Sequence, residues 1–378
     1  MSRERALARV DRGAIRANAR LLARAAGRAE LMAVVKADGY GHGATAAALA
    51  ALEGGARRLA VATAAESEAL RSDGIGAPLL VMGPLVGREV ARAIAAHADI
   101  VAWTPQACLA AAAAGRAAGR PARVHLKLDT GMGRLGARPE DVAALVEAAD
   151  RPGIEVAGIM THFATADLPA AADGGFFREQ LLRFRAAADA LRPRFPGAAL
   201  HAANSAATLR AEEGLDARLD VVRCGIALYG CSPFGANPDE HGLRPAMSLV
   251  SYVAAVKTVR SMESVGYGRA WRASRGTRVA AVPIGYGDGY SRSLSNRAEV
   301  LVGGRRRPVV GTISMDQLTV ELGPDGVEEV GDEVVLIGRQ GDERITVEEI
   351  ARLRDTINYE VTTGLGTARV RRVHEDGP

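Results

Sequence analysis

From residue 30 to residue 224, the sequence alternates between short apolar segments, typical of buried strands, and longer segments typical of helices. The segments that we expect to form strands are Leu31–Val35, Leu59–Ala62, Leu79–Met82, Ile100–Ala102, Arg123–Leu128, Glu155–Met160, Ala199–Ala202 and Asp220–Arg223. Eight strands separated by helices favour a (β/α)8, TIM-like barrel over an open doubly wound sheet.

Several of the helices have recognisable first residues. Asp11 can cap a helix that follows a short strand, Ala6–Val10, and ends near Gly27. The residues Thr63–Glu66 fit a capping box, and Thr104–Pro105 fit a cap followed by a first-turn proline. These starts support the alternation of strands and helices.

The pattern changes after Leu243. Short strands are expected at Ser248–Val259, Val279–Pro283, Glu299–Val302, Pro308–Ile313, Leu318–Leu322 and Glu333–Ile337. Gly303–Gly304 is typical of a hairpin turn, and one helix is expected at Thr346–Arg354, where a capping box opens it. The chain therefore divides into a barrel, residues 11–242, and a mainly β C-terminal domain, residues 243–378.

The composition excludes several classes of protein. The 378 residues are 48% hydrophobic and 24% charged, as in a globular protein, and the net charge of +4 is small for this length. Arginines cluster only at Arg305–Arg307, which a solvated hairpin tip explains better than a nucleic-acid site. No apolar run reaches the ~20 residues of a membrane helix. We therefore expect neither a nucleic-acid nor a membrane partner.

The termini and the cysteines bear on the compartment. The first residues, Met1–Arg5, lack the apolar core of a signal peptide. Cys108, Cys224 and Cys231 are an odd set without metal-ligand spacing, so we expect reduced thiols, no metal site and a cytoplasmic protein.

The unusual residues of the barrel fall at the carboxyl ends of its expected strands. Barrel active sites lie at that rim, where phosphate is commonly held after the last two strands. Lys36, Lys127, His162, Ser205 and Arg223 all stand there. Each has a structural explanation by itself, such as a core histidine or a surface ion pair. Five on one rim predict an active site.

The first strand and the residues after it are the most informative. Leu31–Val35 is apolar throughout, as in a strand buried on both faces, and Lys36 follows directly. Three glycines at alternate positions, Gly39, Gly41 and Gly43, allow a tight turn close to a ligand. The pattern leaves two interpretations open. Lys36 is either a solvated residue at a strand end or a Schiff-base lysine that holds a carbonyl cofactor.

A series of motifs resembles the alanine racemases, a family of barrel-type (fold type III) enzymes that use pyridoxal 5′-phosphate. The motifs are AVVKADGYGHG (33–43), KLDTGMGRLG (127–136), THFATAD (161–167), HAANSAA (201–207), VRCGIALYG (222–230), VGYGR (265–269), IGYGDG (284–289), SMDQ (314–317) and INYEV (357–361). The resemblance covers nearly the whole chain. It implies interconversion of L- and D-alanine, which supplies D-alanine for cell-wall peptidoglycan, and it implies that the strand within residues 1–10 joins the C-terminal domain.

The resemblance assigns the cofactor site. It implies that Lys36 forms the aldimine with pyridoxal phosphate and is released as a base when the substrate forms its external aldimine. The implied phosphate ligands are Tyr40, Ser205, the backbone N–H groups of Gly225 and Ile226, and Tyr359.

The resemblance also assigns the residues around the ring. Arg223 faces the pyridine nitrogen, where a guanidinium cannot act as an acidic partner and so restrains the cofactor as an electron sink. His162 is linked to Arg223. Arg134 binds the phenolic oxygen and the substrate carboxylate, and Lys127 resembles a lysine that is carbamylated in the family. An unmodified Lys127, either paired with Asp129 or exposed to bulk solvent, is the alternative.

The second catalytic base implied by the resemblance is Tyr267, which lies in the β-rich part of the chain. Substrate carboxylate is implied to bind the backbone N–H of Met315, with Asp316 beside it. In the family these residues reach the active site across a head-to-tail homodimer. The chain departs from the family at Thr312, where an arginine is common, which leaves the character of the substrate entrance open.

Two other enzymes are alternatives. A barrel-type amino-acid decarboxylase normally places an acid at the pyridine nitrogen, and Arg223 argues against that. A broader-specificity racemase is harder to distinguish from an alanine racemase by sequence. Such enzymes tend to be exported with a disulfide, and we expect neither feature here. A non-catalytic carrier of the cofactor would leave Tyr267 and the SMDQ motif unexplained.

Overall fold

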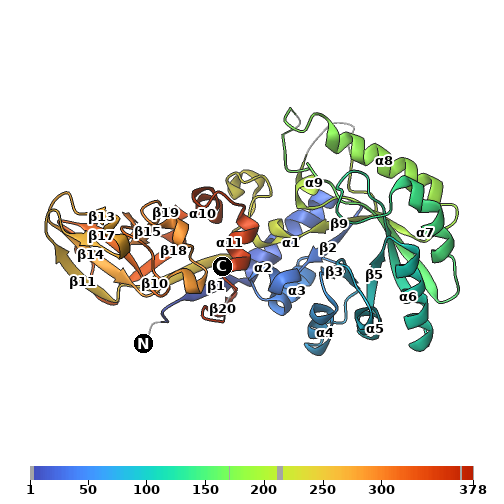
Figure 1. The fold of residues 1–378 in the computed structure, drawn as a ribbon, viewed down its shortest axis with the longest axis horizontal. Coiled ribbons are helices and arrows are strands. Elements are labelled where there is room, and N and C mark those ends of the chain that lie inside the picture. The colour runs from blue at the N-terminus through green and yellow to red at the C-terminus, as the bar shows by residue number, and fades with distance from the viewer. Residues whose placement is uncertain (1–3, 170, 211–215, 367, 378) are drawn as a thin grey trace.

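The computed structural model describes residues 4–169, 171–210, 216–366 and 368–377. The molecule is elongated, with a barrel at one end and a β-rich domain at the other (Figure 1). One large cluster of buried apolar side chains runs through both parts. A second cluster, of only four buried residues, lies in the outer part of the β-rich domain and includes Val259 and Val265.

Eight parallel strands form the barrel, in the order β8-β7-β6-β5-β4-β3-β2-β9. They are β2 (Glu30–Val34), β3 (Arg58–Val61), β4 (Leu79–Val81), β5 (Ala98–Ala102), β6 (Ala122–Lys127), β7 (Ile154–Met160), β8 (Ala199–His201) and β9 (Val221–Cys224). Arg223 donates its backbone N–H to the carbonyl of Ala203, 2.9 Å away, next to β8, and so brings β9 back to the first strand of this order. The predicted fold class, a barrel followed by a mainly β domain, is confirmed.

Three of the helices that surround the barrel, those after Asp11, Thr63 and Thr104, begin where their caps predict. The helices of the barrel are α1 (Arg12–Ala26), α2 (Lys36–Tyr40), α3 (Ala44–Glu53), α4 (Ala64–Ser72), α5 (Arg88–Ala95), α6 (Pro105–Ala117), α7 (Val142–Ala149), α8 (Phe176–Leu191) and α9 (Ser205–Leu209). Asp11 accepts a hydrogen bond from the N–H of Ala14, and Thr63 and Glu66 form the reciprocal capping box. Thr104 caps α6. None of the described helices is long and apolar enough to cross a membrane.

The β-rich domain contains three sheets. The largest is built from β1 (Leu7–Asp11), β10 (Met247–Tyr252), β15 (Glu299–Val302), β16 (Arg305–Pro308), β18 (Glu333–Gln340), β19 (Glu343–Ile345) and β20 (Arg371–Glu375). A second holds β11 (Ala255–Val259), β14 (Thr277–Val282) and β17 (Leu318–Gly323), and a third holds β12 (Ser264–Val265) and β13 (Trp271–Arg272). Two helices, α10 (Val347–Leu353) and α11 (Asn358–Gly364), follow β19. Strand β1 lies between β10 and β20.

Two predicted strands of this domain are wrong. Ser248–Val259 is two strands in different sheets, because the backbone N–H of Val253 still binds the carbonyl of Asp332 whereas that of Ala254 binds Ala281. Pro308–Ile313 is not a strand, since β16 ends at Pro308, after the Gly303–Gly304 turn. Beyond Pro308, only Val309 makes a bridge, to Val320. Short polar strands such as β13 and β20 lack the apolar alternation that would predict them.

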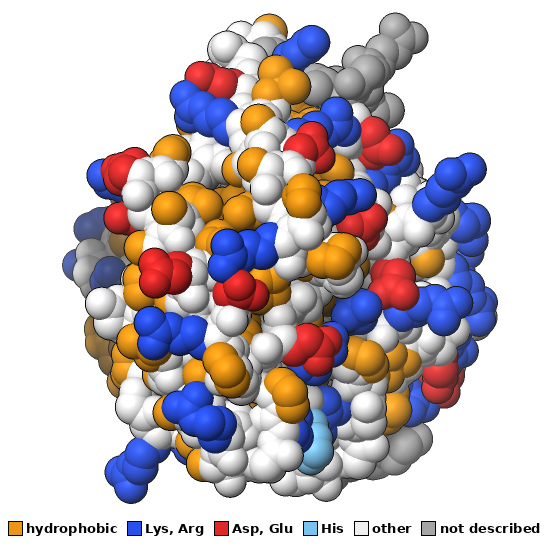
Figure 2. Space-filling view, turned by 90° about the vertical axis from the view of Figure 1, so that its right-hand side faces the viewer, with side chains coloured by type: hydrophobic (Ala, Val, Ile, Leu, Met, Phe, Trp, Pro, Cys, Tyr) orange, Lys and Arg blue, Asp and Glu red, His pale blue; other side chains and the backbone are white. Residues whose placement is uncertain are grey.

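The arginine cluster at 305–307 follows the Gly303–Gly304 hairpin turn, as predicted, but only Arg305 is exposed to solvent there. Arg306 forms ion pairs with Glu299, Glu343 and Glu349, and Arg307 binds Glu328, whose side chain is buried. The arginines therefore tie β16 to neighbouring elements. Charges of both signs are also interspersed on the barrel end of the molecule (Figure 2).

The last turn of the barrel meets the chain that leads to the β-rich domain at Gly230, after the 3-10 helix η2 (Ile226–Tyr229). Gly230 has φ +75°, and a Cβ there would lie 1.8 Å from the carbonyl oxygen of Arg244. The Asn18 side chain binds the carbonyls of Leu228 and Arg244 and accepts from the N–H of Arg244. This junction has no room for a side chain.

Gly230→Ala is expected to destabilise the protein by roughly 3 kcal/mol or more, because the methyl group requires the backbone to move. The matched control is Gly74→Ala. Gly74 has φ +83°, but no atom lies within 4 Å of the place that a Cβ would take, so this variant should lose only about 1 kcal/mol to conformational strain. Thermal unfolding of both variants tests this, and equal losses would contradict it.

Candidate active site

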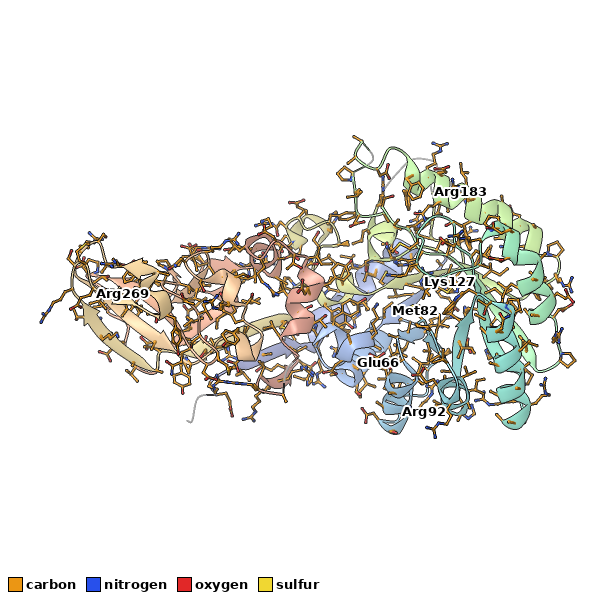
Figure 3. All side chains as sticks on the ribbon, viewed as in Figure 1. Glu66, Met82, Arg92, Lys127, Arg183 and Arg269 are labelled. Atoms are coloured by element: carbon orange, nitrogen blue, oxygen red, sulfur yellow. The ribbon has the colours of Figure 1, made fainter. Side chains whose placement is uncertain are left out.

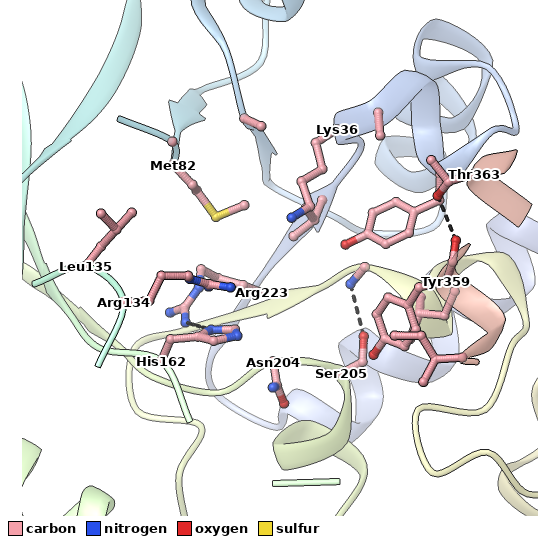
Figure 4. A pocket seen from close by; sticks show the side chains of 18 of the residues that line it. Lys36, Met82, Arg134, Leu135, His162, Asn204, Ser205, Arg223, Tyr359 and Thr363 are labelled. Atoms are coloured by element: carbon pink, nitrogen blue, oxygen red, sulfur yellow. Dashed lines mark hydrogen bonds between the residues drawn. The ribbon is translucent and has the colours of Figure 1, made fainter. Parts of the chain in front are cut away.

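A cavity of about 870 Å³ opens at the carboxyl ends of the barrel strands. Lys36, Arg134 and Arg223 point into the same space, and Tyr359 and Thr363 of α11 close one side of it (Figure 4). The cavity thus combines the barrel rim with a helix of the C-terminal domain. Most sequence-predicted rim residues line it, namely Lys36, Tyr40, Lys127, Arg134, His162, Ser205, Arg223, Gly225, Ile226 and Tyr359.

Lys36 is the first residue of α2, separated from the end of β2 by one residue, and the turn that follows is left-handed. Ala37, Asp38, Gly39 and Tyr40 have φ values of 51°, 51°, 62° and 53°. The glycines of this segment predict an unusual turn, but the sequence does not predict that Ala37, Asp38 and Tyr40 adopt the same conformation. A left-handed residue other than glycine costs roughly 1–2 kcal/mol, so the surroundings must impose the turn.

Contacts from three parts of the chain hold this turn. The N–H of Ala37 donates to Glu66 Oε1 over 2.6 Å, from the capping box of α4. Asp38 accepts from the N–H of Ala44 at 2.9 Å and from Arg372 Nη1 at 2.7 Å. On the same strand, β20, His374 Nε2 lies 2.8 Å from the carbonyl oxygen of His42. The backbone around Lys36 is therefore fixed by both domains.

The charges around Lys36 favour its neutral amine. Burial lowers the pKa of Lys36, the nearby Arg134 lowers it further, and Glu66 opposes the shift. A lysine with a lowered pKa can act as a nucleophile or a base near neutral pH.

Arg223 is buried, with 3% of its surface exposed, and hydrogen bonds fix its guanidinium. Nη2 donates to the carbonyls of Thr161 and Ala202 at 2.8 and 2.9 Å and lies 3.3 Å from His162 Nδ1. Nη1 lies 3.0 Å from His201 Nδ1. Burial lowers the pKa of Arg223 to about 10. None of these partners is a carboxylate, which is unusual for a buried cation.

Lys127 and Arg134 add positive charge near Arg223 (Figure 4). Burial, then Arg223 and Arg134, lower the pKa of Lys127 to about 8. The predicted alternative, a pair between Lys127 and Asp129, is not found, because Asp129 accepts instead from the N–H groups of Gly131 and Gly133. Neither cation makes a side-chain hydrogen bond with any residue that the structure describes.

At the other end, a small cradle of polar groups surrounds Ser205. Its Oγ accepts from the backbone N–H of Gly225 at 3.0 Å and from that of Ala227 at 3.4 Å. A Cβ at Gly225 would lie 2.3 Å from the phenol oxygen of Tyr40, so only glycine fits there. The Tyr40 and Tyr359 rings lie 6.1 Å apart, and burial raises the pKa of both phenols, which stay protonated donors.

Three predicted site residues lie outside this cavity within one chain. Tyr267 and Met315 are 73% and 50% exposed, and Asp316 is exposed beside Met315. Figure 3 shows Arg269, which shares the 3-10 helix η4 (Tyr267–Arg269) with Tyr267, at the far end of the molecule from Lys127. The chain alone cannot bring Tyr267 to Lys36.

The loop with Met315 is nevertheless fixed by hydrogen bonds and ion pairs. The N–H of Gly287 donates to the carbonyl of Met315 at 2.9 Å. The buried carboxylate of Asp288 binds Arg5 at 2.6 Å and Arg369 at 3.1 Å, and Arg369 also pairs with Asp316. The sequence alone does not reveal this role of Asp288, although the IGYGDG motif contains it.

Thr312 and His201 are two further residues whose contacts the sequence does not predict. The hydroxyl of Thr312, the position where the family often has arginine, donates to the carbonyl of Tyr267 at 2.9 Å and so holds η4. His201 stands at the end of an expected strand, within the HAANSAA motif, but its contact with Arg223 depends on two strands meeting.

The charges of the cavity define the class of ligand that it can hold. Lys36, Lys127, Arg134 and Arg223 line it, whereas Glu360 is the only acidic residue among the lining residues described. Such a site requires anions, and the Ser205 cradle suits a phosphate group. The fold and the cavity therefore define a barrel of the enzyme type, with an anion site suited to a phosphorylated cofactor beside a buried lysine.

Comparisons with known proteins agree with this class. Residues 10–233 match the profile of the alanine racemase N-terminal domain, and residues 246–374 match that of the C-terminal domain. The alanine racemase of Symbiobacterium thermophilum is 44% identical over 373 residues, which are 97% of this chain and 96% of the relative.

Two solved structures are similar over nearly their whole length. Alanine racemase from Streptomyces lavendulae is 38% identical with a TM-score of 0.91, and the match covers 100% of this chain and 99% of that one. Alanine racemase from Bartonella henselae, described with covalently bound pyridoxal phosphate, is 26% identical with a TM-score of 0.85 and coverage of 99% and 100%. The chain belongs to the alanine racemase family, which depends on pyridoxal phosphate. The predicted family is thus confirmed, and the alternative enzymes are not favoured.

The lowered pKa of Lys127 gives a pH-dependent prediction. An unfolded lysine titrates near ~10.4, so from about pH 8 to pH 10 the folded protein loses this proton first. Below pH 8 the buried charge destabilises the fold fully, and this penalty shrinks as the pH rises. Lys127→Met apoprotein should therefore unfold at a higher temperature than wild type at pH 7, and the difference should shrink by pH 10.

The control for this measurement is Lys257→Met, which changes an exposed lysine of β11. Both variants are compared with wild type in buffers free of bicarbonate. A difference for Lys127→Met that does not change between pH 7 and pH 10 would contradict the pKa shift.

Proposed function

We propose that this protein is a racemase that interconverts L-alanine and D-alanine with pyridoxal phosphate, and that it supplies D-alanine for cell-wall peptidoglycan. The observation that carries the proposal is the placement of Lys36, with its lowered pKa, between the Ser205 cradle and the cations Arg134 and Arg223. Family membership supports the substrate. The substrate is a small amino acid, whose carboxylate suits a cavity with so few acids.

The residues of the cavity fit the cofactor at each of its functional groups. Lys36 would hold the aldehyde carbon, and Tyr40, Ser205, Tyr359 and the N–H groups of Gly225 and Ile226 would hold the phosphate. The N–H of Gly225 is already directed at Ser205 Oγ, 3.0 Å away, and a phosphate oxygen can share these donors. When bound, pyridoxal phosphate supplies an electron-withdrawing ring that acidifies the α-hydrogen of the substrate.

Arg223 would face the ring nitrogen of the bound cofactor. Its Nη1 and Nη2 atoms are engaged, and Nε has no hydrogen-bond partner among the described residues, so Nε is free to donate into the cavity. A donor that keeps its own proton leaves the ring nitrogen unprotonated and limits delocalisation. This restraint suits racemisation, in which the proton must return to the α-carbon.

Two bases on opposite faces move the α-proton. Lys36 works on the face of the cofactor and handles the hydrogen of D-alanine. Tyr267 of the partner subunit handles that of L-alanine, in a head-to-tail homodimer whose subunits also contribute Met315 and Asp316 to each other's sites. The exposure of Tyr267 and Met315, and the rigid mounting of their loops, support this arrangement.

Arg134 binds the substrate carboxylate and the phenolic oxygen of the cofactor, and Lys127 carries a carbamate that positions Arg134. A neutral amine is needed for reaction with carbon dioxide, and the lowered pKa of about 8 gives Lys127 a much larger neutral fraction at neutral pH than an ordinary lysine has. The carbamate would replace the positive charge of Lys127 with a negative one among the three other cations of the cavity, Lys36, Arg134 and Arg223. The protein is cytoplasmic, in keeping with its three buried, free cysteines.

The first test is chiral analysis of L-alanine incubated with the pyridoxal phosphate-loaded protein. We expect D-alanine to accumulate to a racemic mixture without release of carbon dioxide, which a decarboxylase would produce. Lys36→Ala should lower the rate by at least about a thousandfold. Borohydride reduction should attach the cofactor to Lys36 alone, and because the sequence has only three lysines, peptide mapping is decisive. Label on Lys127 or Lys257 would contradict the assignment.

The second test separates the two bases by subunit complementation. Lys36→Ala mixed with Tyr267→Phe should regain about one quarter of wild-type activity, because about half of the dimers are mixed and one of their two sites has both bases. Tyr267→Phe mixed with the Lys36→Ala, Tyr267→Phe double variant is the control and should regain none. Absence of complementation despite proven subunit exchange would rule out the shared site.

A further inference from the structure

The interior of the barrel below Arg223 is polar, whereas barrels of this kind are usually filled with branched apolar side chains. Strand β6 shows the cause. Its alternate residues Arg123, His125 and Lys127 share one face, which is the face directed into the barrel. Lys127 reaches the cavity at the carboxyl end, and His125 lies one layer deeper, with 1% of its surface exposed.

Four buried side chains form a continuous row through this interior. Arg223 Nη1 lies 3.0 Å from His201 Nδ1, and His201 Nε2 lies 2.7 Å from His125 Nδ1. His125 Nε2 lies 3.2 Å from Asp99 Oδ2. Exposed fractions of 3%, 0%, 1% and 8% from Arg223 to Asp99 exclude bulk water from the row. It connects the active-site arginine with the amino-terminal part of β5.

The direction of every hydrogen bond in the row follows from its ends. A guanidinium can only donate, so His201 Nδ1 accepts and its proton lies on Nε2. That N–H donates to His125 Nδ1, which leaves the His125 proton on Nε2, where it donates to Asp99. Both histidines are therefore neutral Nε2–H tautomers, and the carboxylate of Asp99 accepts at the end.

The surrounding charges agree with this assignment. Burial lowers the pKa of His125 and of His201, and Arg58, from β3, lowers both further. Arg223 also lowers the pKa of His201, and Arg123 also lowers the pKa of His125. Asp99 opposes the shift in the pKa of His125. Burial by itself raises the pKa of Asp99, but His125 and Arg123 outweigh it and keep the pKa below its usual range. The row is thus neutral in its middle and ends on the carboxylate of Asp99, whose other oxygen, Oδ1, accepts from Arg123 Nε at 3.0 Å.

The backbone makes specific room for His125. The pairing of β6 with β7 shifts register between Val124 and His125, a local irregularity that re-aims a side chain. Opposite His125 stands Gly158, where a Cβ would lie only 2.3 Å from His125 Nδ1. A glycine and a register shift at the same point indicate that the barrel backbone is adapted to the imidazole of His125.

We propose that Asp99, His125 and His201 are positioning residues for Arg223, which fix its guanidinium and provide its counter-charge through two oriented imidazoles. The described partners of Arg223 include no carboxylate, and Asp99 is the carboxylate to which it is connected by hydrogen bonds. The inference rests on the proposed function, in which Arg223 faces the cofactor ring. It extends the active site to the other end of the barrel.

The row of hydrogen bonds requires one particular tautomer of each histidine. Without the Asp99 carboxylate, His125 can place its proton on Nδ1, and His201 then meets a donor instead of an acceptor. His201 would turn its own proton toward Nδ1, where Arg223 already donates. Two donors facing each other in a buried site are unfavourable, so Arg223 would move.

The test compares Asp99→Asn with Glu155→Gln, both carboxylate-to-amide changes. Glu155 is an exposed partner of Arg123 on β7 and binds neither histidine, so it is the matched control. The first measurement uses the full-length apoprotein labelled with ¹⁵N-histidine, which has only seven histidines. In wild type, His125 and His201 should each show a slowly exchanging Nε2–H signal. Asp99→Asn should shift both signals and accelerate their exchange at least about tenfold, whereas Glu155→Gln should change neither.

The second measurement is steady-state racemisation by the loaded protein. Asp99→Asn should lower kcat about 3- to 30-fold with little change in KM for alanine, the pattern of a residue that acts through another. Glu155→Gln should stay within about twofold of wild type. Should Asp99→Asn not fold, Asp99→Glu displaces the carboxylate by one methylene and is expected to shift the same two signals.

Three results would overturn the proposal. The first is a proton on Nδ1 of His201 in wild type. The second is an Asp99 variant in which the N–H signal of His125 shifts but that of His201 does not. The third is an equal kcat for Asp99→Asn and Glu155→Gln. If the wild type does not racemise alanine, the proposed function fails, but the histidine signals still report on the row independently.

Discussion

The left-handed turn after Lys36 is the constraint on which the active site depends. Three residues with side chains, Ala37, Asp38 and Tyr40, adopt positive φ in succession, which together costs roughly 3–6 kcal/mol of local strain. Strain of this kind persists only where the surroundings determine the backbone completely. Here Glu66 of α4 binds one side and Arg372 of β20 the other. Tertiary contacts thus set the direction of the lysine. The same left-handed backbone places the phenol of Tyr40 against Gly225.

The charge of the cavity is the second organising principle. Barrel strands deliver cations to one rim, and the described acids near it are occupied elsewhere: Glu66 binds backbone N–H groups, and Asp129 binds those of its own loop. The excess positive charge is tolerated because burial lowers the pKa of Lys36 and Lys127. An anionic ligand therefore gains more from binding here than it would at a neutral site.

The barrel could be predicted from the sequence because buried parallel strands such as Leu31–Val35 are apolar throughout and alternate with capped helices. The rim residues could be predicted because position at a strand end is a local property. The left-handed turn could not, since nothing in Ala37 or Asp38 requires positive φ. The split between Val253 and Ala254 was missed because one apolar run serves two sheets.

Contacts between distant strands were the other limit of prediction. His125 lies inside an expected strand and Asp99 just before another, and only barrel closure brings them into one row with Arg223. Asp288 was part of a recognised motif, yet its partners Arg5 and Arg369 lie far away in the sequence. The roles of Tyr267, Met315 and Asp316 came from family resemblance alone, and within one chain these residues lie away from the cavity.

The parallel pairing of β1 with β20, in which Leu7 lies opposite Arg371, affects the order in which the protein can assemble. During synthesis, the barrel strands leave the ribosome long before residues 371–375, and a pairing of such sequence separation closes late. Arg372 and His374, which hold the turn after Lys36, belong to that late strand. The nascent barrel therefore carries its lysine on an incompletely fixed backbone, and the reactive geometry forms only when the chain's distant segments meet.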